Sequence, residues 1–193
     1  MTLTPPPRRR WTSAALLQCA AFGAVAGIFI AGLAPLSGTL ALASPVLYAL
    51  VAGVHAVGPM LALRWTRAPG AAILTAAFAG LLAAPFNGLG LLLTVALVAP
   101  AAALELVLML GRHRFESTSL WYLGAATAGA TIFGLSLPII DEAALTPFVV
   151  WGTLVGRLLS YSGAGWLSLW FEAALVRAGT RRVLTHHRPS PRR

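Results

Sequence analysis

The sequence is short of cysteine and of familiar catalytic motifs. Its single cysteine, Cys19, lies inside the first apolar run, so this chain alone cannot build a disulfide framework or a thiolate metal site. The motifs GxxxxGK(S/T), HExxH and GxSxG are absent, and histidines and carboxylates do not cluster at catalytic spacing. These absences predict a protein that is not an enzyme and that holds no metal or cofactor. Any ATP-driven activity would need a separate ATPase.

Charge is scarce and is mostly of one sign. Only 10% of the residues are charged and 58% are hydrophobic, while 14 basic residues against 5 acidic ones give a net charge of +9. In a soluble protein this balance would indicate a nucleic-acid partner. Here the basic residues, all arginines, lie in short blocks between long apolar runs. The pattern predicts a multi-pass membrane protein in contact with lipid and without nucleic acid.

The apolar runs recur along most of the 193 residues and predict an all-α fold with six transmembrane helices. The third helix is expected to be short and broken, because Pro-Gly precedes it and Pro-Phe-Asn-Gly ends it. We expect a cytoplasmic extension over 1–12, a transmembrane domain over 13–176 and a basic cytoplasmic tail over 177–193. The predicted spans are 13–36, 40–63, 71 to about 86, 89–110, 120–139 and 146–176.

The arginines give an independent test of this count, because connections rich in arginine stay in the cytoplasm. If the N-terminus is inside and the chain crosses six times, all arginines except Arg157 fall on the cytoplasmic side. The predicted outer connections 37–39, 87–88 and 140–145 contain none, and the last contains Asp141 and Glu142. Both termini are therefore predicted in the cytoplasm, with the protein in the cell membrane.

Three polar side chains are predicted at similar depth in the inner half of the membrane. A rise of roughly 1.5 Å per residue, counted from the nearest cytoplasmic arginine, places Glu105 about 10 Å, Gln18 about 12 Å and His55 about 14 Å above the inner boundary. Ionisable groups at such depths face a protein interior or a wet cavity. The group is either a structural hydrogen-bonded cluster of the first, second and fourth spans or a proton relay. We favour the structural cluster, because only one carboxylate lies this deep.

A second polar group is predicted in the outer half. The same measure places Arg157 roughly 30 Å and Tyr48 roughly 24 Å above the inner boundary. Tyr161 follows Arg157 by four residues and shares its helical face. The alternative is that Arg157 extends to the outer surface near the acidic residues, and that the aromatic residues anchor the interface. The full group, suited to a small, flat, polar solute, is Tyr48, Phe86, Asn87, Trp151, Arg157 and Tyr161.

The first span contains small residues at a spacing of four, which lets helix backbones approach closely in lipid. This spacing marks the first span as the best docking face for a partner, although alanine and glycine are abundant throughout the chain. The residues concerned include Ala20, Gly23, Ala24 and Gly27.

Three stretches, LRWTRAPGAAIL, APFNGLGLLL and APAAALELVLMLGRHR, resemble the S components of energy-coupling factor (ECF) vitamin transporters. The resemblance is to the YkoE type, which is associated with thiamine and its hydroxymethylpyrimidine precursor, and it is clearest over 63–114. Those proteins have a similar Arg-x-Pro-Gly-Ala-Ala start to the third span, a Pro-Phe/Trp-Gly-Leu turn, and an Ala-Glu pair late in the fourth. This sequence differs in the inserted Asn87 and in having Leu104 before Glu105.

The resemblance implies six helices, a pocket in the outer half that is open to the outside, and no catalysis by this subunit. The implied partners are a T-type transmembrane coupling subunit, which would dock through Ala20 and Ala24 with Gly23 and Gly27 adjacent, and a pair of ATPases. The broken end of the third helix would then line the pocket. The expected function is the substrate-binding subunit of an importer of thiamine or its precursor. The alternative is a small integral-membrane accessory or assembly protein without a ligand.

Overall fold

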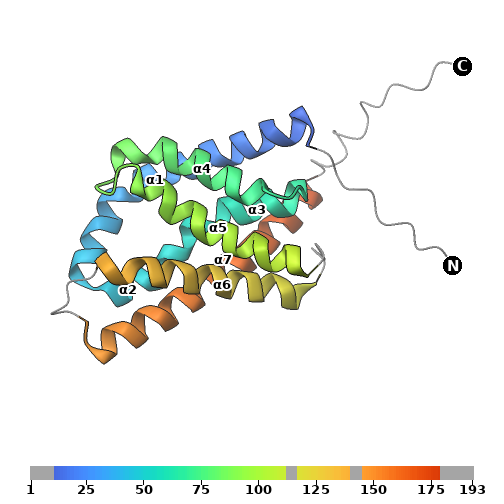
Figure 1. Ribbon diagram of the computed structural model, residues 1–193. Coiled ribbons are helices and arrows are strands. Elements are labelled where there is room, and N and C mark those ends of the chain that lie inside the picture. The colour runs from blue at the N-terminus through green and yellow to red at the C-terminus, as the bar shows by residue number, and fades with distance from the viewer. Residues whose placement is uncertain (1–10, 112–116, 140–144, 179–193) are drawn as a thin grey trace, which may run out of the picture.

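The computed structural model describes residues 11–111, 117–139 and 145–178, and within these ranges it contains helices and no strands. The helices form six successive segments (Figure 1), which confirms the predicted all-α fold with a short third helix. The segments are α1 (Ser13–Ala43); α2 (Pro45–Val51), η1 (Ala52–Ala56) and α3 (Val57–Thr66); α4 (Ala71–Ala83) with η2 (Ala84–Phe86); α5 (Leu92–Leu110); α6 (Thr118–Ser136) with η3 (Leu137–Ile139); and α7 (Pro147–Arg177).

The helices form a closed ring of neighbours. α1 packs on α4, α4 on α5, α5 on α6, and α6 on α7; α7 packs on α2, η1 and α3, and α3 returns to α1. Small side chains make this close packing possible, because fully buried alanines line α4 along its whole length. The core of the bundle therefore lies around α4, α3 and the inner faces of α5, α6 and α7.

The break between the first two segments lies farther along the chain than the sequence predicts. Residues 37–39, expected to be an outer connection, belong to α1, and the second span begins at Pro45. Pro35 lies inside α1 and does not end it, although a proline within a helix removes a hydrogen bond and favours a kink. The chain turns at Ser44, whose hydroxyl accepts a hydrogen bond of 3.3 Å from the main-chain N–H of Leu47. Pro45, at the first position of α2, favours the same start.

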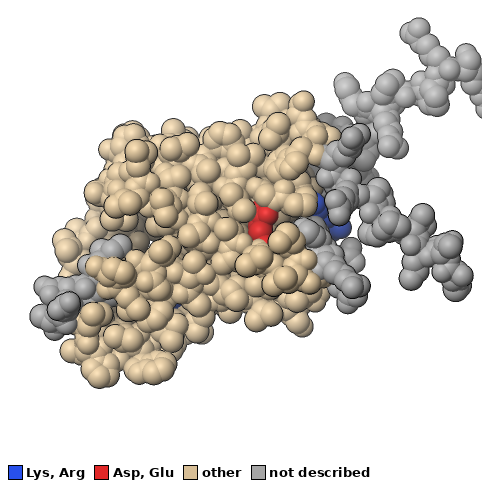
Figure 2. Space-filling view, in the orientation of Figure 1, with Lys and Arg blue, Asp and Glu red and all other residues tan. Residues whose placement is uncertain are grey.

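The outside of the bundle is apolar. Three segments are long and apolar enough to cross a membrane: Ser13–Ala43, Pro45–Thr66 and Leu92–Leu110. The face shown in Figure 2 is almost entirely uncharged, and the basic side chains visible there gather at one end of the bundle. The first turn of α1 and the last turn of α7 lie at the same end (Figure 1). This surface is that of a protein surrounded by lipid with its basic end in water.

Candidate functional site

The side chain of Arg157, on α7, is buried and incompletely paired. It is 5% exposed, and its Cζ atom lies 4.9 Å from the centroid of the Tyr48 ring on α2. Its Nε atom has no hydrogen-bond partner, and no carboxylate among the described residues forms an ion pair with it. The contact with Tyr48 contributes about 0.5–2 kcal/mol, which is less than the cost of burying an unpaired cation. Such a residue within a membrane protein makes Arg157 the candidate for a functional site.

The backbone around Arg157 is held from two sides by glycines. On one side, a Cβ atom added at Gly129 of α6 would lie 2.8 Å from the main-chain oxygen of Arg157. On the other, the N–H of Gly53 in η1 donates a 2.6 Å hydrogen bond to the Ser160 hydroxyl, and a Cβ atom at Gly53 would lie 2.2 Å from the Ser160 main-chain oxygen. These approaches are open only to glycine. The position of Arg157 is therefore set by its neighbours on both sides.

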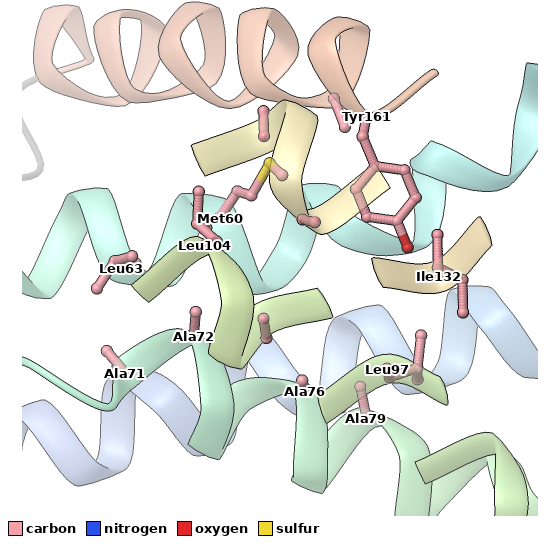
Figure 3. Packing of buried hydrophobic residues seen from close by; sticks show 14 of the residues in the cluster. Met60, Leu63, Ala71, Ala72, Ala76, Ala79, Leu97, Leu104, Ile132 and Tyr161 are labelled. Carbon is pink, nitrogen blue, oxygen red and sulfur yellow. The ribbon is translucent and has the colours of Figure 1, made fainter. Parts of the chain in front are cut away.

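Tyr161 lies one turn after Arg157 and points into the interior of the bundle (Figure 3). It is buried and lines a cavity of about 10 Å³ enclosed by η1, α3, α5, α6 and α7. A cavity of this size holds about one water molecule. Its wall is apolar apart from the tyrosine and is formed by Ala56, Pro59, Met60, Leu97, Pro100, Ala101, Leu104, Ala128 and Tyr161.

His55 lies beside the Arg157 site. It is part of η1 and interacts electrostatically with Arg157. The sequence prediction placed His55 in the inner half of the membrane. That prediction counted depth from Arg64 and assumed that all cytoplasmic arginines lie at the same depth. Instead, Arg64 forms an ion pair with Glu172, with an Nη2 to Oε2 distance of 2.7 Å. Glu172 lies five residues before Arg177, so Arg64 stands about 7 Å deeper than assumed, and His55 with it.

Glu105 forms the cap of the short helix α4. Its Oε1 atom accepts hydrogen bonds from the N–H groups of Ala72 (2.7 Å) and Ile73 (3.2 Å), and its Oε2 atom accepts one from Gly70. Gly70 has a φ of 87° and no side chain to cap the helix, so α5 supplies the carboxylate that the helix N-terminus favours. Glu105 thus has a structural role, and these three hydrogen bonds join it to the start of the third span, whereas the predicted cluster joined it to Gln18 and His55.

Thr153 was not predicted as a site residue. It lies on α7 four residues before Arg157, is 2% exposed, and its hydroxyl has no hydrogen-bond partner. Thr153, Arg157 and Tyr161 follow one another at a spacing of four residues, which places them on one face of the helix. This row of polar residues could have been recognised from the sequence.

The arrangement of helices is shared with a known transporter subunit. A structure described as the crystal structure of an S-component of an ECF transporter matches this chain with a TM-score of 0.81 and 20% sequence identity. The match covers 94% of this chain and 100% of that one. This chain has the fold of an ECF transporter S-component. No protein-family model matches the sequence, and no curated protein matches it significantly.

Three residues of the predicted outer group lie apart from Arg157 in this S-component fold. Trp151 is 65% exposed and Phe86 is 66% exposed. The Oδ1 atom of Asn87 accepts a 3.0 Å hydrogen bond from the N–H of Leu89, which closes an exposed turn after η2. The broken end of the third span therefore faces outward. Of the predicted group, the structure brings together Tyr48, Arg157 and Tyr161.

The small residues of α1 divide between two faces. A Cβ atom at Gly23 would lie 2.6 Å from the Cβ atom of Phe78, and one at Gly27 would lie 3.0 Å from the main-chain oxygen of Ala79. Both glycines thus pack against α4. The sequence had suggested that they belong to a free docking surface, and they do not. Ala24 is exposed and Ala20 is partly exposed. The outer face of α1 continues in bulky apolar side chains, namely Leu17, Val25 and Ile28.

Proposed function

We propose that this protein is the substrate-binding subunit of an ATP-driven ECF-type vitamin importer. The observation that carries the proposal is the buried, incompletely paired Arg157 beside Tyr48, inside a fold shared with an ECF S-component. A buried cation without an acidic partner destabilises the free protein, and a ligand that pairs with it would account for its presence. The protein would lie in the cell membrane with both termini in the cytoplasm, as the arginine distribution favours.

The proposed substrate is a small, flat solute of the thiamine type. Tyr48 and Tyr161 offer aromatic surface for a ring, and His55 and Arg157 offer polar groups beside it. A positive charge at Arg157 disfavours cationic thiamine. A neutral or anionic precursor, such as hydroxymethylpyrimidine or its phosphate ester, therefore fits this site better than thiamine itself.

Binding requires the site to widen. The cavity beside Tyr161 measures about 10 Å³, whereas ligand sites commonly enclose at least roughly 300 Å³. The second segment is the one that can bend, because the 3-10 helix η1 interrupts that segment between α2 and α3, next to Arg157. In this proposal a movement of α2 away from α7 admits the solute.

The proposed partners are a T-type membrane subunit and a pair of ATPase subunits. The docking surface would be the outer face of α1 at Ala20 and Ala24, where small side chains let a second helix approach. Gly23 and Gly27 support this surface from behind through their contact with α4.

Co-purification with a T-type subunit tests the proposal. We expect Ala24→Leu to reduce recovery of the complex by about tenfold, which corresponds to about 1.4 kcal/mol, because the bulky side chain would prevent close approach of a second helix. The matched control is Ala130→Leu, at an exposed position of α6, which should assemble normally. Isolated Ala24→Leu protein should bind ligand like the parent. If the parent neither binds a solute nor recruits the subunit, the protein is an accessory protein without a ligand.

A further inference from the structure

Two buried polar atoms of α7 lack partners, and they lie on one face of the helix. These are the hydroxyl oxygen of Thr153 and the Nε atom of Arg157. The two side chains are 2% and 5% exposed, and their spacing of four residues places them one turn apart. A buried polar group without a hydrogen bond destabilises a fold, so two neighbouring ones require an explanation.

The chemistry of these groups indicates what would satisfy them. A guanidinium only donates hydrogen bonds, and a threonine hydroxyl can donate one as well. Their complement is an acceptor that carries negative charge, such as a carboxylate or a phosphate. Both acidic side chains in the described ranges are engaged elsewhere, because Glu105 caps α4 and Glu172 pairs with Arg64. Within those ranges, the protein supplies no anion of its own to this pair.

We propose that Thr153 and Arg157 bind the anionic group of the ligand, a carboxylate or a phosphate. Tyr161, one turn farther along the same face, would then contact the uncharged part of the ligand beside the interior cavity. This assignment rests on the proposed function where it takes the ligand to be a transported solute. It narrows the substrate class to anionic, ring-bearing solutes.

The first experiment uses inorganic phosphate as the probe and the thermal midpoint of the purified full chain in a neutral detergent as the readout. Phosphate should raise the midpoint of the parent saturably above chloride at equal ionic strength. The rise should be lost in Arg157→Met and reduced in Thr153→Val. The matched control is Thr131→Val, because the Thr131 hydroxyl already donates to the Thr127 main-chain oxygen at 2.9 Å.

The same variants distinguish a ligand site from a structural role. Without phosphate, Arg157→Met should melt at the same temperature as the parent or higher, because an unpaired buried cation has been replaced by an apolar chain of similar length. A structural arginine would behave in the opposite way. A lower midpoint for Arg157→Met together with an unchanged phosphate response in Thr153→Val would overturn the proposal.

The second experiment compares solutes that differ only in an anionic group. Hydroxymethylpyrimidine is paired with its phosphate ester, and thiamine with thiamine monophosphate, in calorimetric titrations. The phosphorylated member of at least one pair should bind about tenfold tighter or more, as expected for charge-assisted hydrogen bonds. The advantage should disappear in Arg157→Met. Equal binding of both members would refute the anion site but leave the proposed function intact.

A lipid headgroup offers the same anionic chemistry, and nanodiscs distinguish that source. Phosphate should raise the thermal midpoint equally in neutral discs and in discs containing phosphatidylglycerol. If phosphatidylglycerol alone raises the midpoint in the parent but not in Arg157→Met, and phosphate adds nothing, Thr153 and Arg157 bind lipid and the solute assignment is wrong.

Assembly with the T-type subunit is measured separately. A failure to assemble would count against the proposed function and not against the anion site.

Discussion

Replacing Glu105 should loosen the start of α4 and destabilise the whole bundle. Ala71 and Ala72 are fully buried, so the N–H groups that lose the carboxylate would have poor access to water. The substitutions Glu105→Gln and Glu105→Ala remove this cap in two steps. Gln retains one oxygen that can accept from Ala72 and Ile73, but its amide group then faces the N–H of Gly70. Ala removes all three hydrogen bonds.

The magnitude follows from these bonds. A hydrogen bond to a charged acceptor contributes about 1.5–3 kcal/mol to stability. Glu105→Gln, which loses one bond and the charge, should therefore cost about 2–3 kcal/mol, and Glu105→Ala, which loses all three bonds, at least about 4.5 kcal/mol. In a protein of this size about 1 kcal/mol corresponds to about 2–4 °C, so Glu105→Gln should melt about 5–10 °C lower.

Two measurements on the purified full chain test this prediction. Tryptophan fluorescence during heating gives the thermal midpoint, and hydrogen exchange read by mass spectrometry reports on the peptide around Ala72 and Ile73. Exchange there should increase in both variants. The control is Leu106→Ala, at the next residue, whose side chain is exposed.

A different result would refute the capping role. If Glu105 were a proton carrier, Glu105→Gln would keep the midpoint and the exchange pattern of the parent while transport was lost. That outcome would restore the relay that the sequence left open. An equal effect of Leu106→Ala would show that the measured loss is general to this part of α5.

The remaining predictions concern packing and topology. Gly53→Ala should destabilise the protein by about 1–3 kcal/mol or more, since the new methyl group would meet the Ser160 backbone. Gly32→Ala has open space around it and should be neutral or stabilising by up to about 1 kcal/mol, as thermal midpoints can show. In the topology experiment, external cysteine labelling should reach position 141 and miss position 113, and the reverse pattern would overturn the predicted orientation.

Hydropathy predicted the helices well because each segment must be apolar over most of its length. The last helix was expected at 146–176 and runs from Pro147 to Arg177. The end of α1 was predicted at residue 36, whereas α1 continues to Ala43 and the actual turn depends on the local capping by Ser44. Such a cap is a small local feature that an average over many residues hides.

Only part of the candidate site could be predicted, because distance along a helix gives the depth of a residue but not the direction in which its side chain points. Trp151 and Arg157 lie six residues apart on α7, which places them on different faces, and Trp151 turns outward. The predicted depth of His55 was wrong because it was counted from Arg64, which pairs with Glu172 inside the bundle. The partner of Glu105 could not be derived from depth at all, since it consists of main-chain N–H groups.

The unequal helix lengths have a consequence for the surrounding lipid. α4 has 13 residues and α1, packed against it, has 31, which correspond to about 20 Å and about 46 Å of helix. A hydrocarbon layer of roughly 30 Å matches neither length. The long helices can fit this layer by tilting or kinking, and beside α4 a thinner layer would bring the headgroups to the polar turn after η2. The protein therefore favours a thinner bilayer beside α4 than around its long helices. The short α4 limits the thickness of the membrane that the protein can occupy.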